Sequence, residues 1–368
     1  MDLELSPEQR ELRAVARQAL DARAPLSLAR EWLDGGPAAP LHDLLVELGW
    51  YTVGLEPDDG FGLPGLVLLA DQAGRHAAPT ALVDTAVASR IAAHMDGPHA
   101  AAIRAGERSV ALAVLEPNAD WSLAGVSTSL ERHGDGWRLT GRKIGVQHGE
   151  TVDLLMVFAD CAGAPAVVLV PVDRSGITVT AAPGVDPAAA TATVTLDGVI
   201  ADDELALIGD PAAAATRPAF AVGAVATAAE GIGAAAAALD LAIAYAGERH
   251  QFGRPIGSFQ ALKHLLADAH VDRETAWSST LYAAAALDGA LPEAEQAAAI
   301  AAAYGARASR RVVEASIQVL GGIAFTWEHD LHLLQRRVLS CEQRFGGALH
   351  HERWLGAQLA GRRLEVAA

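Results

Sequence analysis

Apolar residues dominate two long stretches in the second half of the chain. Residues 221–245 are apolar on nearly every side, which is typical of a helix buried inside a bundle. Residues 259–287 repeat apolar positions at three- and four-residue spacing, beginning with Phe259, Leu262 and Leu266. Between the two stretches stand the helix breakers Gly253, Pro255 and Gly257. The pattern predicts two long helices joined by a sharp turn.

Helical periodicity also runs through the first hundred residues. Ser6 is suited to cap a helix that begins at Pro7, and Gln9 completes a capping box three residues after the cap. Further helices are predicted at about 41–48, 63–73, 80–94 and 99–105. Together these elements predict an N-terminal helical domain.

The period changes to strict alternation near Ser109. Two strands, 126–132 and 137–140, flank a His-Gly-Asp-Gly turn at 133–136, which predicts a hairpin. Other short strands are predicted at 110–114, 154–159, 166–171, 177–182 and 191–196. After Pro211 the chain returns to helix. We therefore expect an α+β protein with an N-terminal helical domain (1–108), a middle β-domain (109–205) and a C-terminal helical bundle (206–368).

Composition and charge narrow the class of protein. The chain is 51% hydrophobic and 20% charged, as expected of a globular protein, and its formal net charge of -17 argues against nucleic acid or an anionic membrane as partner. We expect no membrane span, because we find no apolar segment with the necessary length and lack of charge. We also expect no signal peptide. Cys161 and Cys341 lie outside any metal-ligand spacing, and the 13 His residues form no H-x-x-x-H motif. We expect a cytoplasmic protein without a bound metal.

The predicted turn carries chemistry of its own. Arg249, His250, Gln251 and Phe252 place a cation, two hydrogen-bonding groups and a flat ring on a rigid connection. Such a set suits a phosphate and an aromatic heterocycle. Taken alone, the same residues favour the plainer interpretation, a helical hairpin with a solvated arginine and a core phenylalanine.

Two motifs resemble those of the acyl-CoA dehydrogenase flavoenzymes. Residues 249–260 resemble the signature R-x-x-F-G-x-x-I-x-x-x-Q. Residues 318–328 resemble Q-x-x-G-G-x-G-x-x-x-E, with Ala324 in place of the third glycine. The resemblance extends over nearly the whole chain. It implies an N-terminal α-helical domain, a middle β-barrel domain and a C-terminal four-helix bundle, with FAD shared at an interface between subunits.

The resemblance also shows where a catalytic base is expected, and no base is there. The glutamate of the family's Y-E-G-T stretch corresponds to Gly346, and the position that some relatives use instead corresponds to Gly223. We therefore expect no catalytic residue in this chain. The remaining glutamates of the region, Glu230, Glu342 and Glu352, are interpreted as surface carboxylates.

The flavin-ring contacts of the β-domain are replaced as well. The family's V-T-E-P-G-A-G-S-D appears as residues 114–122, with Leu115 for the threonine and Trp121 for the serine. The family's K-x-W-I-T-N-G appears as 143–149, with Gly145 for the tryptophan and Gln147 for the threonine. The frame of each motif survives, whereas the side chains that touch the ring are gone.

These differences favour a non-catalytic subunit of a heteromeric, FAD-dependent acyl-CoA dehydrogenase. By resemblance, the cofactor-binding positions are Arg249, Gln251, Phe252, Gln318, Gly321 and Gly322. Arg249 would pair with the pyrophosphate of FAD. The two glycines would let the backbone approach its ADP portion. The chain would then lend these contacts to a catalytic partner in a heterotetramer.

Two other interpretations of the function remain open. A self-sufficient homotetrameric dehydrogenase would need a relocated base, for which Glu230 and Glu342 are the candidates. A scaffold of the same fold would bind no cofactor. For the preferred reading, the resemblance implies an acyl-CoA substrate held by the partner, with sterol side-chain or other lipid catabolism as the context.

Overall fold

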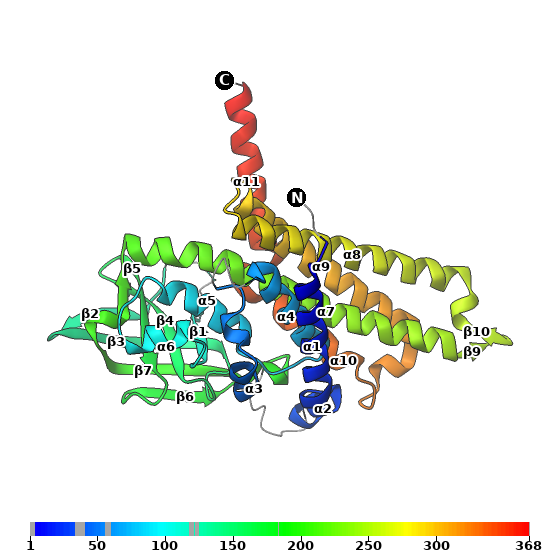
Figure 1. The fold of residues 1–368 in the computed structure, drawn as a ribbon, viewed down its shortest axis with the longest axis horizontal. Helices are drawn as coiled ribbons and strands as arrows, with labels where there is room; N and C mark the ends of the chain where they lie inside the picture. Colours follow the sequence, from blue (N-terminus) through cyan, green and yellow to red (C-terminus); the bar gives the residue numbers. More distant parts are fainter. Residues whose placement is uncertain are drawn as a thin grey trace. The chain divides into compact units, whose positions relative to one another are not determined.

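The longest helix, α7 (Asp210–Glu248), is apolar on nearly every side, as the sequence predicts. A window of this helix is long enough to span a membrane and has a mean hydropathy of 1.5. By length and composition, the prediction that the chain contains no such segment is therefore wrong. However, 94% of that window is buried inside the protein. The helix is therefore the central helix of a bundle (Figure 1).

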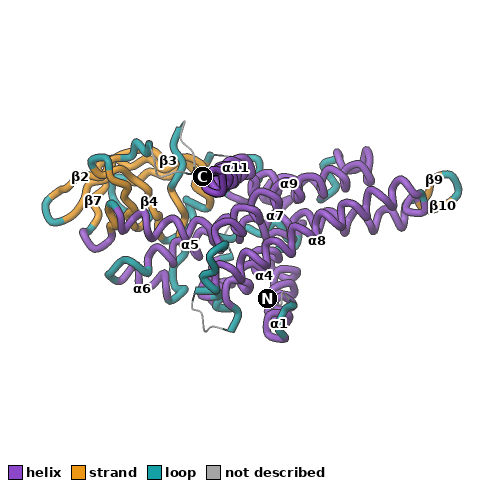
Figure 2. Tube along the Cα trace, turned by 90° about the horizontal axis from the view of Figure 1, so that it is seen from above, coloured by secondary structure: helices purple, strands orange, loops and turns teal. Residues whose placement is uncertain are grey.

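In this computed structural model the described residues are 4–33, 41–55, 60–117, 121, 125–182 and 184–367. Two compact units share the chain. The helical unit comprises residues 1–36, 63–78 and 224–368, and the sheet unit comprises 37–62 and 79–223. Figure 2 distinguishes the strands of the sheet unit from the helices by colour.

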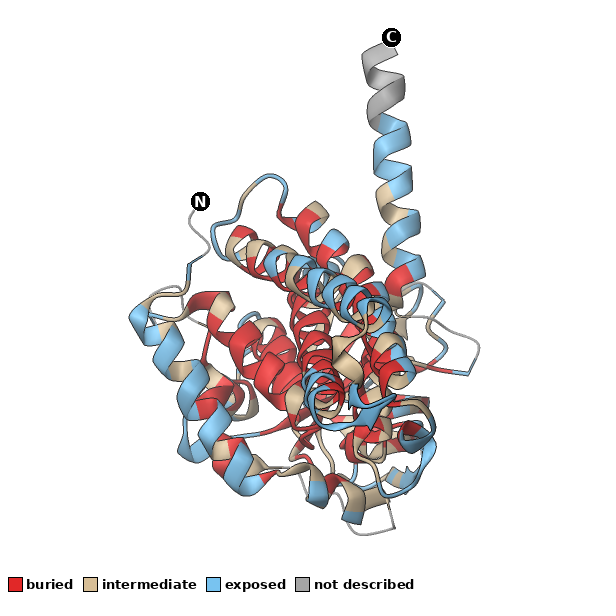
Figure 3. Cartoon of the chain, turned by 90° about the vertical axis from the view of Figure 1, so that its right-hand side faces the viewer, coloured by how far each residue is buried: buried red, intermediate tan, exposed pale blue. Residues whose placement is uncertain are grey.

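The helical unit is built on α7 and the helices that follow it. Its described elements are α1 (Pro7–Arg23), α2 (Leu26–Leu33), α4 (Gly62–Arg75), the second part of α7, β9 (His250–Gln251), β10 (Arg254–Pro255), η4 (Ile256–Ser258), α8 (Gln260–Asp288), α9 (Ala294–Leu320), η5 (Gly321–Phe325), α10 (Leu331–Glu342), η6 (Arg344–Gly346) and α11 (Gly347–Ala367). Alanine, valine and leucine of α7, α9 and α10 form most of its main core. Figure 3 shows buried residues on the helices of the interior and exposed residues on the outer ones. The predicted capping box of α1 is confirmed, because Gln9 N donates to Ser6 Oγ and Ser6 N donates to Gln9 Oε1.

Helices α4 and α7 approach each other until their backbones touch. A Cβ atom added at Gly74 would lie 2.7 Å from the carbonyl carbon of Glu230, and one added at Gly233 would lie 2.8 Å from that of Asp71. Real Cβ atoms do not come so close to backbone, so both positions require glycine. This crossing sets the distance between the two helices.

The sheet unit contains one mixed sheet with flanking helices. Its described elements are α3 (His42–Glu47), η1 (Trp50–Thr52), α5 (Leu82–Ala92), α6 (Pro98–Arg104), β1 (Val110–Ala113), β2 (Ser129–His133), β3 (Gly136–Gln147), β4 (Leu154–Cys161), β5 (Ala164–Pro171), β6 (Ile177–Ala181), η2 (Pro187–Ala189), β7 (Thr191–Ala201), η3 (Asp203–Leu205), β8 (Ala206–Ile208) and the first part of α7. The strand order is β6-β7-β3-β2-β4-β5-β8, and β1 pairs in parallel with β4. The predicted hairpin is confirmed as β2–β3, with His133 opposite Gly136. Strands β3 and β7 run longer than predicted because they pair with each other along most of their length.

The second edge of β1 is satisfied by side chains of α5. Val110 N donates to Thr85 Oγ1 at 3.0 Å, and Leu112 N donates to Asp84 Oδ2 at 3.2 Å. An unpaired strand edge would leave these amides buried without acceptors, which costs free energy. Helix α5 therefore closes this edge, with which no strand pairs among the described residues.

Candidate functional site

The turn between α7 and α8 is a tight hairpin that presents its side chains outward. Arg249 N donates to Tyr245 O, and Ile256 N donates to Arg249 O, both at 2.8 Å. Phe252 lies at the tip with a left-handed backbone, φ +53°, followed by Gly253. The Phe252 side chain is 92% exposed, so it is not the core residue that a simple hairpin would contain. Phe252 is one of seven non-glycine residues of the described chain with a positive φ, a conformation that such residues seldom adopt.

The same turn carries three basic side chains and an amide. Arg249, His250, Gln251 and Arg254 are all exposed. The guanidinium of Arg254 lies 4.1 Å from the centre of the Phe259 ring. Within the described residues, the Arg249 side chain has no ion-pair partner. In a chain with a formal charge of -17, a turn with these cations offers a local site for an anion.

The second motif lies at the same end of the helical unit. Val319, beside Gln318, packs in one cluster with Ala246 of α7 and with Ile256 of the turn. Gln318 is exposed. Gly321 has φ +62° and so favours glycine, but a Cβ atom at Gly322 would meet nothing within 4 Å. The chain's own packing therefore gives no reason for a glycine at position 322.

The turn at the expected base position has a backbone that only glycine adopts without strain. Gly346 has φ +99°, and a Cβ atom there would lie 2.8 Å from Cδ2 of His350. Its neighbours Phe345 and Gly347 also have positive φ. The second expected position, Gly223, is buried in α7. The residue types at both positions supply no carboxylate.

Glu230 is buried and tied to arginines, so the interpretation of this residue as a surface carboxylate is wrong. Arg337 Nη1 donates to Glu230 Oε1 at 2.7 Å, and Arg344 Nη1 lies 3.5 Å from Glu230 Oε2. Arg337 also donates to the backbone oxygens of Ala77 and Ala78, at the end of α4. The carboxylate is thus the centre of a buried ion-pair cluster.

Glu342 is also buried, which corrects the second of the three interpretations. Its carboxylate lies 3.4 Å from Nη1 of Arg310 and lines a pocket between α7, α9 and α10. The hydroxyls of Thr227 and Ser309 line the same pocket, both buried and without a hydrogen-bond partner among the described residues. Glu352 is exposed and pairs with Arg307, as expected of a surface carboxylate.

The frame of the β-domain motifs is a buried ion pair that the sequence reading missed. Lys143 Nζ donates to Glu116 Oε1 at 2.6 Å, and both side chains are almost fully buried. Glu116 also accepts hydrogen bonds from the backbone and hydroxyl groups of Ser127 and Thr128. A lysine and a glutamate 27 positions apart gave no local signal of this pairing.

The positions that touch the ring in the family fit a flavin poorly here. Leu115 is aliphatic, and its Cδ1 lies 3.8 Å from where a Cβ at Gly145 would be. Gly145 has φ +63°, which disfavours any larger residue. Trp121 packs edge-on against Phe220, which in turn contacts Phe158. The neighbouring motif positions 118–120 and 122 lie outside the described residues. Of the described residues, Leu115, Trp121 and Gly145 therefore do not reproduce the family's ring contacts.

The Glu116–Lys143 pair makes the stability of the sheet unit sensitive to acid. Burial alone would raise the pKa of Glu116, but hydrogen bonds from Lys143, Ser127 and Thr128 outweigh it and lower the pKa from 4.5 to about 2. This stabilisation is complete above pH 4.5 and is lost as the pH falls toward 2, an effect of about 3 kcal/mol. We expect the unfolding free energy of Glu116→Gln, measured in urea, to depend less on pH in this window. Glu131→Gln, which changes an exposed glutamate of β2, should behave as the wild type, and equal pH slopes for all three would contradict the assignment.

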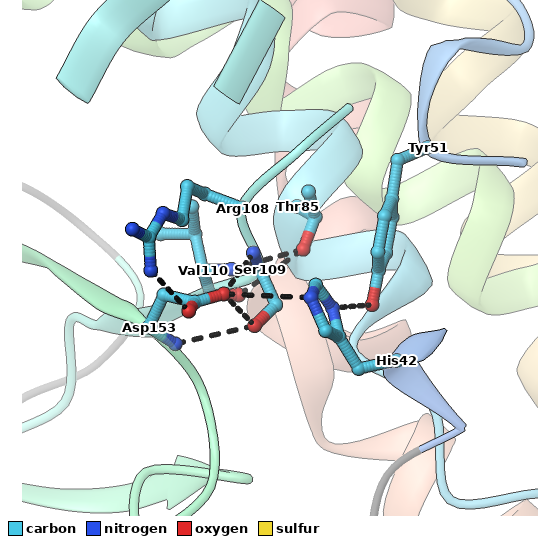
Figure 4. A network of polar contacts seen from close by, with 7 residues as sticks. All are labelled: His42, Tyr51, Thr85, Arg108, Ser109, Val110 and Asp153. Atoms are coloured by element: carbon cyan, nitrogen blue, oxygen red, sulfur yellow. Dashed lines mark hydrogen bonds and ion pairs between the residues drawn. The ribbon is translucent and has the colours of Figure 1, made fainter. Parts of the chain in front are cut away.

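A further polar network in the sheet unit holds strand ends together (Figure 4). Asp153 Oδ2 accepts from the backbone and hydroxyl of Ser109, and Asp153 Oδ1 accepts from Arg108. His42 lies between Asp153 and the hydroxyl of Tyr51. Burial alone would raise the pKa of Asp153, but the hydrogen bonds from Ser109 and Arg108 outweigh it and lower that pKa. Burial raises the pKa of the Tyr51 hydroxyl. Because Asp153 and Ser109 directly precede the paired strands β4 and β1, the network is a structural clamp.

The chain is similar to known acyl-CoA dehydrogenases over part of its length. The family model described as "Acyl-CoA dehydrogenase, C-terminal domain" matches residues 213–357. Acyl-CoA dehydrogenase FadE34 of Mycobacterium tuberculosis is 42% identical over 160 residues, which cover 38% of this chain and 22% of FadE34. Acyl-CoA dehydrogenase IpdE2 of Mycolicibacterium smegmatis is 42% identical over 132 residues, covering 36% of this chain and 40% of IpdE2. The chain thus spans less than two thirds of the length of these curated relatives.

Solved structures match over nearly the whole chain. The Tcur3481–Tcur3483 steroid acyl-CoA dehydrogenase has 27% identity and a TM-score of 0.84, covering 97% of this chain and 99% of that one. The ChsE4–ChsE5 complex of Mycobacterium tuberculosis shares the fold, with 24% identity, a TM-score of 0.86 and coverage of 98% and 99%. Residues 213–357 therefore match the C-terminal domain of the acyl-CoA dehydrogenase family, and the chain as a whole has the acyl-CoA dehydrogenase fold. The expected fold class is confirmed.

Proposed function

We propose that this chain is the non-catalytic subunit of a heteromeric, FAD-dependent acyl-CoA dehydrogenase, and that it lends cofactor contacts to a catalytic partner. One observation carries the proposal. The retained cofactor motifs are exposed at one end of the helical unit, whereas the base position, Gly346, has a glycine-only backbone. The chain keeps the cofactor contacts that a neighbouring subunit would use, and it lacks the base that its own active site would need.

The residues at the exposed end fit the adenosine and pyrophosphate end of FAD. Arg249 offers an exposed guanidinium, which suits a diphosphate. Phe252 offers an outward ring, and Gln251 and Gln318 offer amide groups. Gly321 and Gly322 leave open space next to the backbone, where a ligand would approach closely. When bound, FAD supplies a hydride acceptor for α,β-desaturation of an acyl-CoA thioester.

The remainder of the active site must come from the partner. Leu115, Gly145 and Trp121 supply no ring site in this chain, and Glu230 is held by Arg337 and Arg344. We therefore assign the base, the thioester contacts and the flavin-ring contacts to a related chain. The assembly has two copies of each chain and acts in the cytoplasm. Its substrate class is a CoA thioester of a sterol side chain or a similar lipid, by likeness to the steroid acyl-CoA dehydrogenase named above.

The direct test compares flavin retention in variants of the assembled complex. Arg249→Ala removes a charge-assisted contact, and we expect flavin affinity to fall by about 1.5–3 kcal/mol, roughly ten- to 150-fold. Gly322→Ala fits the chain's own fold, since nothing lies near its Cβ, but it should also lower flavin content. Flavin absorbance per complex is measured after co-expression with the acyl-CoA dehydrogenase-like chain encoded nearest to this one.

The controls separate the lending role from the alternatives. Lys263→Ala removes an exposed cation of α8 with the same change of charge, and flavin content should stay at the wild-type level. The chain expressed alone should contain no flavin. A yellow homo-oligomer that oxidises an acyl-CoA would instead establish a self-sufficient enzyme, and a colourless complex would establish a cofactor-free scaffold.

A further inference from the structure

A small polar cavity lies inside the helical unit, between α7, α9, α10 and the start of α11. The space open to the centre of a water molecule is about 20 Å³. One ordered water needs about 10–15 Å³ by this measure, so the cavity has the size of a site for one water. Three of its lining side chains, Thr227, Ser309 and Glu342, offer polar groups from three different helices.

Thr227 is a polar exception in an apolar part of α7. Between residues 221 and 239, every residue except Thr227 and Glu230 is alanine, valine, glycine, isoleucine or leucine. Glu230 has Arg337 as its partner. The Thr227 side chain is 3% exposed, and its hydroxyl has no hydrogen-bond partner among the described residues. A buried hydroxyl without a partner costs free energy, so such a group in a folded protein usually has a water as its partner.

Ser309 reaches the same cavity from α9 and is in the same situation. It is 2% exposed, and within the part of the chain that the structure describes its hydroxyl has no partner. A Cβ atom added at Gly231 of α7, which also lines the cavity, would lie 3.7 Å from Ser309 Oγ. Because Gly231 has no side chain, the space beside this hydroxyl stays open.

Glu342 supplies a charged acceptor to the cavity. Its side chain is only 9% exposed. Among the described residues its one hydrogen bond is the 3.4 Å contact with Arg310 Nη1. An ionised carboxylate has about four lone-pair sites for hydrogen bonds. The carboxylate of Glu342 can therefore accept further hydrogen bonds from a donor inside the cavity.

We propose that this cavity is a binding site for an ordered water molecule, which joins the hydroxyls of Thr227 and Ser309 to the carboxylate of Glu342. A water can donate to the carboxylate and also bond to both hydroxyls, and buried waters make about three hydrogen bonds. A hydrocarbon group in the same space would leave all three polar groups without partners, so the lining excludes it. The water site goes beyond the proposed function, since it involves neither the flavin nor the partner subunit.

The direct test is a high-resolution crystal structure of the full chain, alone or in its complex. We expect electron density for a water within about 3.2 Å of both hydroxyl oxygens. The same crystals of Thr227→Val should show this water displaced or absent. Well-defined side chains around the cavity of the wild type, with no water peak between them, would overturn the proposal.

Urea unfolding of the purified protein gives a second test, in which the sign of the effect decides. Thr227→Val exchanges the hydroxyl for a methyl group. At a water site the change removes a hydrogen bond, and we expect the urea midpoint to fall. In a dry cavity it would remove an unpartnered polar group, and the midpoint would rise.

Thr216 of α7 provides a matched control. Its hydroxyl is also buried and unpartnered among the described residues, but Thr216 does not line this cavity. Thr216→Val should therefore raise the midpoint. A fall in Thr227→Val with a rise in Thr216→Val would support the water site. A rise in Thr227→Val, or an equal fall in both variants, would overturn it and leave the lending role intact.

Discussion

Gly233→Ala is expected to destabilise the helical unit by about 3 kcal/mol or more, the upper range for overpacked sites. The added methyl group would overlap the backbone of Asp71 in α4, and backbone cannot rotate away as a side chain does. Separating α4 from α7 would also separate Gly74 from Glu230, the second point of contact. The measurement is urea unfolding of the purified protein, followed by circular dichroism at the helix band.

A matched variant in the same helix isolates the cause. Gly247 also lies in α7, but a Cβ atom there would meet nothing within 4 Å. Gly247→Ala should therefore stabilise the protein by up to about 1 kcal/mol, the helix propensity gained over glycine. Similar unfolding midpoints for Gly233→Ala and Gly247→Ala would mean that the helices do not cross at van der Waals contact.

Arg337→Met is expected to cost about 3–5 kcal/mol, because it leaves a buried charge without its partner. The carboxylate of Glu230 would lose its 2.7 Å ion pair, and the backbone oxygens of Ala77 and Ala78 would lose their donor. Arg344 lies farther from the carboxylate, at 3.5 Å, and offers a weaker replacement. Thermal unfolding of the purified variant measures the loss.

An exposed pair provides the control for this prediction. Arg307 of α9 pairs with Glu352 of α11, and both side chains are more than 40% exposed. Arg307→Met should cost no more than about 1 kcal/mol, as surface ion pairs do. If Arg337→Met costs as little, then Glu230 is not a structural centre, and its assignment as a relocated base regains support.

Local patterns were enough to predict most of the secondary structure. The capping box at Ser6, the breakers at Gly253 and Pro255, and the alternation around the 133–136 turn each act over a few residues, and the structure contains all three. Strand β8 was missed because three residues are too few to show a period. The two motifs of the exposed end were recognised by their resemblance to the signatures of a known family.

Burial of charge was not predictable from such patterns. Glu230 lies in an apolar helix and was interpreted as solvated, yet its partner Arg337 is 107 positions away. The same holds for Lys143 and Glu116, which meet only when β3 packs beside the segment after β1. The glycines at the α4–α7 crossing gave no signal either, because in one sequence a helical glycine looks like a loss of helix propensity. Only the structure shows which atoms an added Cβ atom would contact.

The apolar character of α7 has a consequence for how the protein is made. During synthesis α7 leaves the ribosome before α8, α9 and α10, which later bury it, have been made. Until then it exposes an apolar segment with the length and composition of a membrane span. Any truncation that ends between α7 and α9 leaves the same segment bare. Chaperones that hold nascent chains therefore have a defined target here, and shortened versions of the protein should precipitate rather than fold.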